Sequence, residues 1–147
     1  MSERILVASP DYVARMPALR DPDGLTAHCC LTYWLGPEDV VWKFMRKGSL
    51  QEMIVPSSFT SNNGHVLKQL AVMGHGIALL DDYTVADEFS RGGLVRLLRN
   101  YSVTNSSFDE GIYATFLQTN YLAEKIRVFL DFMTENVPRQ IGTAGRR

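Results

Sequence analysis

Short apolar runs alternate along the chain with segments whose apolar residues recur at helical spacing, and this alternation predicts an α/β domain. Residues 5–8 form a continuous apolar run, and Ser9-Pro10-Asp11 follows it as a helix N-cap with proline at the first helical position. Residues 61–64 precede a helix that Gly74-His75-Gly76 ends, and residues 77–80 form the next buried strand. We therefore expect one mixed sheet flanked by helices.

The remaining segments continue the α/β pattern. Val40, Trp42 and Phe44 alternate with their neighbours and predict a strand whose hairpin partner includes residues 53–55. The other expected elements, in chain order, are a helix over 11–16, a turn or short helix over 21–28, a strand at 31–35, a helix over 84–90, a strand at 94–98, a mobile polar loop at 102–110, a strand at 112–117 and a helix over 122–136. One domain should cover residues 1–137, followed by a disordered tail over 138–147.

Charge and composition narrow the class of protein. The chain has 147 residues, of which 15 are Lys or Arg and 16 are Asp or Glu, so its formal net charge is -1 and no overall positive field attracts DNA. The apolar run near the N-terminus is too short for a signal peptide or a membrane span. The adjacent cysteines Cys29 and Cys30 do not suggest a secreted disulfide framework. These features predict a cytoplasmic protein that does not associate with a membrane.

No motif has the spacing of a catalytic or metal site. The histidines at positions 28, 65 and 75 lack partners at zinc-ligand spacing. Cys30 follows His28 by two residues, a spacing that does not form the hydrogen bond of a nucleophile and its base, so we expect a buried structural cysteine. The pair Asp81-Asp82 is expected to be solvated. We therefore predict that the chain is not an enzyme and binds no cofactor or metal.

The segment Thr60-Ser61-Asn62-Asn63 is the strongest candidate for a binding site. Hydroxyl and amide side chains at the start of a helix, together with free N–H groups, bind carboxylates and other anions. An ordinary helix N-cap explains the same residues, and the sequence leaves both interpretations open.

The order of these motifs resembles the effector-binding domain of LysR-type transcriptional regulators, particularly the branch that includes regulators of aromatic-acid efflux. The matching segments are 8–15, 22–31, 61–64, 74–80, 93–95, 112–114 and 125–132, so the resemblance extends from Arg4 to Asn136. One departure is Asp81, which stands where the family usually has a proline.

The resemblance implies a periplasmic-binding-protein-like fold, mainly the second subdomain of the effector domain with its last strand and helix. Such a chain would be the ligand-sensing portion of a transcription regulator, and a small-molecule effector, for example an aromatic or other carboxylate, would bind in the cleft between two subdomains. By position, the effector-binding residues would be Ser9, at the crossing between subdomains, and Thr60, Ser61, Asn62 and Asn63.

The same resemblance implies that DNA is contacted only through an N-terminal winged helix-turn-helix, which this sequence does not contain. The closing strand and helix would lack their usual packing partner, so we expect a homo-oligomer that forms through them or through a sheet edge. The alternatives are a stand-alone truncated dimerisation or interaction domain and a solute-binding module.

Overall fold

The computed structural model describes residues 3–34, 36–108 and 124–136. Residues 3–108 form one unit. Helix α4 (Glu124–Asn136) belongs to a second unit and is described by itself.

Within residues 3–108, the central layer is a five-stranded mixed sheet with the strand order β5-β2-β6-β1-β7. Its strands are β1 (Arg4–Ala8), β2 (Cys30–Tyr33), β5 (Ser57–Ser61), β6 (Ile77–Asp81) and β7 (Val95–Leu97). Strand β2 runs parallel to β5 and β6, whereas β1 runs antiparallel to β6 and β7. Strands β1 and β6 are continuous apolar runs because both of their faces are covered.

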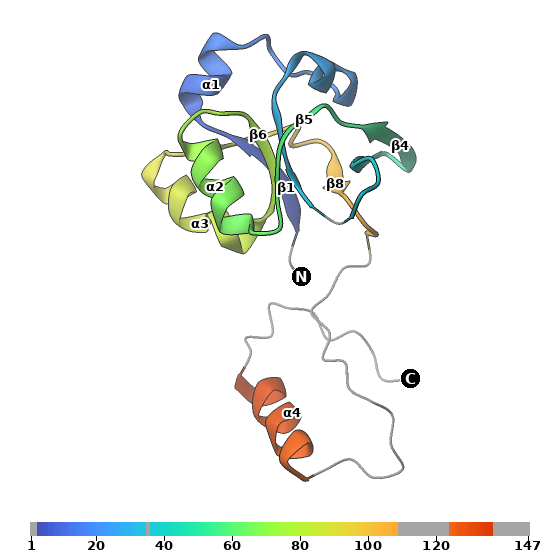
Figure 1. The fold of residues 1–147 in the computed structure, drawn as a ribbon, viewed down its shortest axis with the longest axis vertical. Helices are drawn as coiled ribbons and strands as arrows, with labels where there is room; N and C mark the ends of the chain where they lie inside the picture. The colour runs from blue at the N-terminus through green and yellow to red at the C-terminus, as the bar shows by residue number, and fades with distance from the viewer. Residues whose placement is uncertain (1–2, 35, 109–123, 137–147) are drawn as a thin grey trace. The chain divides into compact units, whose positions relative to one another are not determined.

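Two helices, α2 (Gly64–Val72) and α3 (Asp82–Arg91), cover one face of this sheet (Figure 1). Apolar side chains of the sheet and both helices form a buried cluster on that face, comprising Ile5, Val7, Leu31, Leu67, Ala71, Ala78, Leu80, Val85 and Leu94. Gly92 ends α3 in the left-handed conformation, as the glycine pair at 92–93 predicts.

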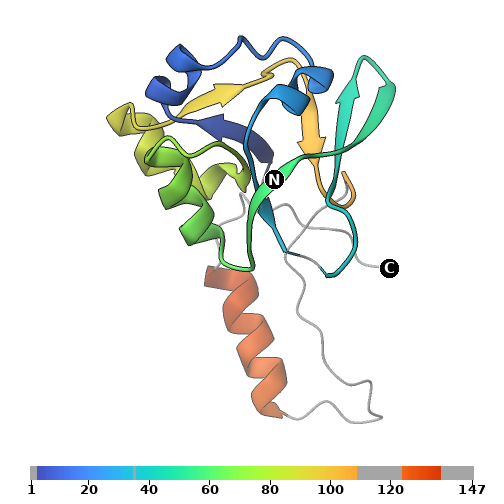
Figure 2. The same ribbon diagram turned by 45° about the horizontal axis from the view of Figure 1, so that its top comes forward.

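A second, three-stranded sheet with the order β4-β3-β8 lies on the other side of the central sheet (Figure 2). Its strands are β3 (Val41–Arg46), β4 (Ser49–Ile54) and β8 (Ser102–Thr104). The turn between β3 and β4 consists of Lys47 and Gly48, both with positive φ, as a tight two-residue hairpin requires. Trp42, Phe44 and Val103 point from this sheet into a core shared with Leu6, Cys30 and Ile77, and helix α1 (Pro10–Arg15) and the 3-10 helix η1 (Pro22–Ala27) contribute Tyr12 and Leu25 to the same core.

Several expectations need correction. The prediction of a single sheet is wrong, because the hairpin pairs with residues 102–104 instead of joining the central strands. Part of the polar loop expected at 102–110 is therefore strand β8. Strand β5 was not expected, and it carries Thr60 and Ser61. The expected closing helix is confirmed as α4, whereas the strand expected at 112–117 and the tail expected at 138–147 lie outside the described residues.

No helix in the described segments is both long and apolar enough to cross a membrane.

Candidate functional site

Four of the five candidate residues lie together where β5 passes into α2. Thr60 and Ser61 end the strand, and Asn63 is the N-cap of the helix. Thr60 pairs with Thr32 and Ser61 with Tyr33 in the parallel ladder between β5 and β2. The segment therefore lies where the C-terminal ends of the parallel strands β2, β5 and β6 meet, a place that we call the sheet edge. Open α/β sheets commonly bind ligands at the C-terminal ends of their strands.

Local hydrogen bonds already occupy two of these side chains. The Ser61 Oγ accepts a hydrogen bond from the Asn63 amide at 3.1 Å, and the Asn63 Oδ1 accepts one from the His65 amide at 3.0 Å. The N-cap interpretation is thus confirmed for Asn63. Among the described residues, the hydroxyl of Thr60 and the carboxamide of Asn62 form no hydrogen bond, and both residues are exposed. These two side chains are the ones available to a ligand.

Ser9 does not join this group. It follows the end of β1, and because β1 runs antiparallel to β6, it lies at the opposite edge of the sheet. From the strand register, Ser9 and Ser61 are separated by about 13 Å along the strands and about 14 Å across them. Ser9 is also buried, and its Oγ accepts the Tyr12 amide at 3.2 Å as the N-cap of α1. Its role as the N-cap of α1 explains why a serine is buried at this position.

Two aromatic side chains that the sequence did not single out accompany Ser61 at this edge. Tyr33 ends β2 beside Ser61, and the Trp34 amide donates to the Ser61 carbonyl at 2.9 Å. Trp34 is 54% exposed. On the neighbouring strands β1 and β6, Arg4 and Asp81 form an ion pair at 3.6 Å, so the acid at position 81 faces a cation.

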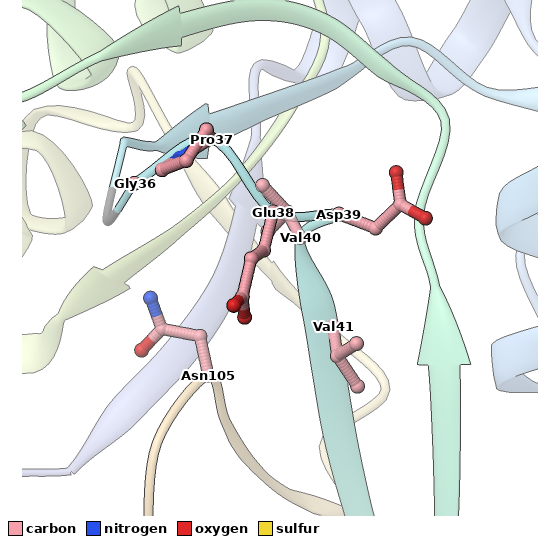
Figure 3. A pocket seen from close by; sticks show the side chains of 7 residues that line it. All are labelled: Gly36, Pro37, Glu38, Asp39, Val40, Val41 and Asn105. Carbon is pink, nitrogen blue, oxygen red and sulfur yellow. The ribbon is translucent and has the colours of Figure 1, made fainter.

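A cavity of about 420 Å³ is lined by Asn105 and by residues 36–41, which come shortly after Trp34 in the chain (Figure 3). The Glu38 side chain is directed toward Asn105, whereas the Asp39 carboxylate points away from it. The Asn105 Oδ1 is buried without a hydrogen-bond partner. Since the described residues of the lining include two acids and no Lys or Arg, they make this cavity electrostatically unsuited to a carboxylate.

The histidine and cysteine motifs have structural roles in the described region. The Tyr12 hydroxyl lies 3.2 Å from His28 Nδ1 and accepts the Cys29 amide at 3.0 Å. Burial lowers the pKa of His28, although a hydrogen bond to the Pro17 backbone acts in the opposite direction. Burial also raises the pKa of the Cys30 thiol to about 12, which removes it as a nucleophile and confirms a buried cysteine.

The glycines at 74–76 serve the turn between α2 and β6. Gly74 has a φ of +79° and its amide bonds to the Ala71 carbonyl, so the expected helix end is confirmed. Within the described residues, no three His, Cys, Asp or Glu side chains are grouped so as to hold a metal ion.

Two solved structures with the same fold are regulatory domains of transcription regulators. The regulatory domain of the C227S variant of AphB from Vibrio vulnificus matches with a TM-score of 0.70 and 26% identity, covering 91% of this chain and 65% of that chain. The regulatory domain of CrgA from Neisseria meningitidis matches with a TM-score of 0.63 and 24% identity, covering 92% and 65%. The chain thus has the mixed α/β fold of these regulatory domains, which is of the periplasmic-binding-protein-like class.

The family model for the LysR substrate binding domain matches residues 1–138, and the chain belongs to that family. It is 28% identical over 142 residues to the HTH-type transcriptional regulator PtxR of Pseudomonas aeruginosa, covering 94% of this chain and 43% of PtxR. It is 27% identical over 142 residues to the activator TtdR of Escherichia coli strain CFT073, covering 96% of this chain and 44% of TtdR. The chain therefore spans less than half the length of these relatives, which are transcriptional regulators and not enzymes.

Proposed function

We propose that this chain is the ligand-sensing part of a LysR-type transcription regulator and that the segment Thr60, Ser61, Asn62 and Asn63 forms a site for a carboxylate effector. The side chains of Thr60 and Asn62 would contact the ligand, and Ser61 and Asn63 would hold the segment in place through their local hydrogen bonds. The match to the substrate-binding family over residues 1–138 carries the proposal. Residues 1–137 are taken as the partial effector-binding domain.

The chemistry of the α2 N-terminus suits an anion. The first amides of a helix carry partial positive charge, and the unpaired groups of Thr60 and Asn62 add hydrogen-bond donors beside them. The acidic cavity at residues 36–41 repels a carboxylate, so the helix end is the favoured place for that group.

An aromatic acid suits this edge better than an aliphatic one. Tyr33 and Trp34 are exposed next to Ser61, and an aromatic ring bound there would bury apolar surface while its carboxylate faced α2. This edge would then be one wall of a cleft, and the effector would act by favouring one of two arrangements of the complete regulator.

The partners follow from the same proposal. DNA would be contacted through an N-terminal winged helix-turn-helix of the whole regulator, and the site of action would be the cytoplasm. The family's regulators also suggest a homo-oligomer, for which α4 offers an apolar stripe formed by Val128, Phe129, Phe132 and Met133. That stripe also supports the second candidate function, a stand-alone interaction domain.

The test is isothermal titration of the 147-residue protein with benzoate and, as the neutral counterpart, benzamide. Asn62→Asp places a negative charge beside α2 without changing side-chain size, and Asn100→Asp is the matched control at an exposed turn. We expect benzoate to bind, benzamide to bind at least about tenfold more weakly, and only Asn62→Asp to weaken benzoate. Absence of benzoate binding, or equal binding by both Asn variants, would refute the proposed site.

A further inference from the structure

The face of the three-stranded sheet that points away from the core has a symmetric pattern of side chains. We call it the outer face and define it by Val41, Lys43 and Met45 on β3 and Leu50, Glu52 and Ile54 on β4. These residues alternate with the core residues Trp42 and Phe44 on β3 and with the half-buried Met53 on β4. The register pairs Val41 with Ile54, Lys43 with Glu52, and Met45 with Leu50. An ion pair is thus flanked on both sides by an apolar pair.

Two of the four apolar side chains of the outer face are exposed to solvent, and the other two, Val41 and Met45, are half-buried. Leu50 is 50% exposed and Ile54 61% exposed, and both lie on the edge strand β4. Apolar side chains that gather on one exposed face commonly mark a site of contact with another protein surface. Here Lys43 and Glu52 neutralise one another at 3.5 Å, so the face carries no net charge to keep a second sheet away.

We propose that the outer face is an interface between two copies of this chain, packed face to face about a two-fold axis that runs between β3 and β4, parallel to both. This rotation places β3 of each copy over β4 of the other. Lys43 then faces Glu52 of the second copy, Val41 faces Ile54, and Met45 faces Leu50. Every apolar side chain meets an apolar one, and every charge meets its opposite.

The charge arrangement identifies a second copy as the occupant. A face with an excess of one charge would fit a partner of opposite charge, whereas a neutral Lys–Glu pair arranged across a symmetry axis is complementary to itself. Two sheets that pack face to face keep their strands within about 30° of one another, so all three pairs of facing residues can remain in contact. The face is small compared with a standard protein interface, and the association should be weak and concentration-dependent.

Charge reversal tests the inference, with sedimentation velocity over a concentration series as the measurement. Lys43→Glu gives a face with two glutamates, and Glu52→Lys gives one with two lysines, so each variant alone should self-associate at least about tenfold more weakly than the wild type. A mixture of the two variants should form a heterodimer about as well as the wild type forms its homodimer, because the two glutamates of one variant then face the two lysines of the other. The double variant K43E/E52K should also recover self-association.

The matched control for Lys43→Glu is Arg91→Glu, which causes the same change in net charge at an ion pair on α3 between the exposed Arg91 and the half-buried Glu88. Circular dichroism verifies that each variant is folded. The inference is overturned if the wild type remains monomeric at millimolar concentration or if the mixed variants associate no better than each variant alone. It is also overturned if association is abolished by Phe129→Asp on α4 and is insensitive to both charge reversals, because the interface would then lie on α4.

Discussion

Replacing Gly76 with alanine should strongly destabilise the protein, because the chain has no space for a side chain at that position. An ideal Cβ on Gly76 would lie 2.5 Å from the Cys29 carbonyl oxygen and 3.2 Å from both the carbonyl carbon and the Cβ of Cys29. The nearest neighbour is backbone and cannot rotate away. Strand β2, which follows Cys29, and strand β6, which follows Gly76, would have to move apart by about 0.9 Å before the new Cβ and the Cys29 oxygen reached an ordinary contact of 3.4 Å.

That movement would disturb hydrogen bonds in the centre of the sheet. The Cys29 carbonyl accepts the Ile77 amide at 2.9 Å, and the next residues, Cys30 and Ile77, are paired between β2 and β6. Overpacking of a buried position combined with a weakened backbone hydrogen bond should cost about 2–3 kcal/mol. For a unit of this size, the melting temperature should fall by about 10 °C.

Gly64→Ala is the matched control. Its Cβ would lie 3.9 Å from the nearest heavy atom, a Leu80 methyl, and its φ is not in the left-handed region. Alanine at the first position of α2 should leave stability unchanged or raise it by a few tenths of a kcal/mol. The assay is urea unfolding followed by circular dichroism, with midpoint and slope compared among the three proteins. Equal midpoints for Gly76→Ala and the wild type, or an equal loss for both alanine variants, would refute the steric argument.

Three further predictions concern the corner formed by α1 and η1. Tyr12→Phe leaves the Cys29 amide without its acceptor and should lower the free energy of unfolding by about 1–2 kcal/mol in urea titrations; an unchanged midpoint would show that water replaces the hydroxyl. The pKa of His28 is lower in the folded protein than in the unfolded one, so neutral His28 stabilises the fold above the unfolded pKa of about 6.5. This stabilisation is lost as the pH falls. The urea midpoint should therefore decrease between pH 7 and pH 5 by less in His28→Gln than in the wild type. With a thiol pKa of about 12, Cys30 should resist iodoacetamide at pH 8 in the folded state while exposed Cys29 reacts, so mass spectrometry should find one alkylation in the wild type and none in Cys29→Ser.

The strongest strands could be predicted from sequence because their pattern is local. The apolar runs at 5–8 and 77–80 reflect burial on both faces, and the hairpin of β3 and β4 has alternation and turn residues of its own. Strand β5 has the sequence Ser-Ser-Phe-Thr-Ser and lies at the sheet edge, where its pairing with β2, and not an apolar pattern, makes it a strand. The pairing of β8 with β3 joins residues about sixty positions apart, which no local pattern encodes.

The candidate site was predictable to the extent that its residues are contiguous. Thr60, Ser61, Asn62 and Asn63 precede a recognisable helix, and their common location follows from the chain itself. Ser9 was grouped with them through the resemblance, but the antiparallel direction of β1 places it at the other edge. Tyr33 and Trp34 were missed because the end of a buried strand and the start of an exposed edge look alike in an apolar sequence.

Two groups of exposed apolar side chains among the described residues differ in their surroundings, and the difference bears on what contacts them. At the sheet edge, Trp34 adjoins unpaired polar groups at Thr60 and Asn62, the mixture that small-molecule sites use to bury a ring and orient its polar group. On the outer face, Leu50 and Ile54 surround a neutral ion pair, a pattern that suits another protein surface. Because the two surfaces share no residue, Asn62→Asp should weaken effector binding and leave self-association intact, whereas Lys43→Glu should weaken self-association and leave effector binding intact. Titration and sedimentation of the same two variants measure this directly, and loss of both properties in either variant would show that the surfaces are coupled.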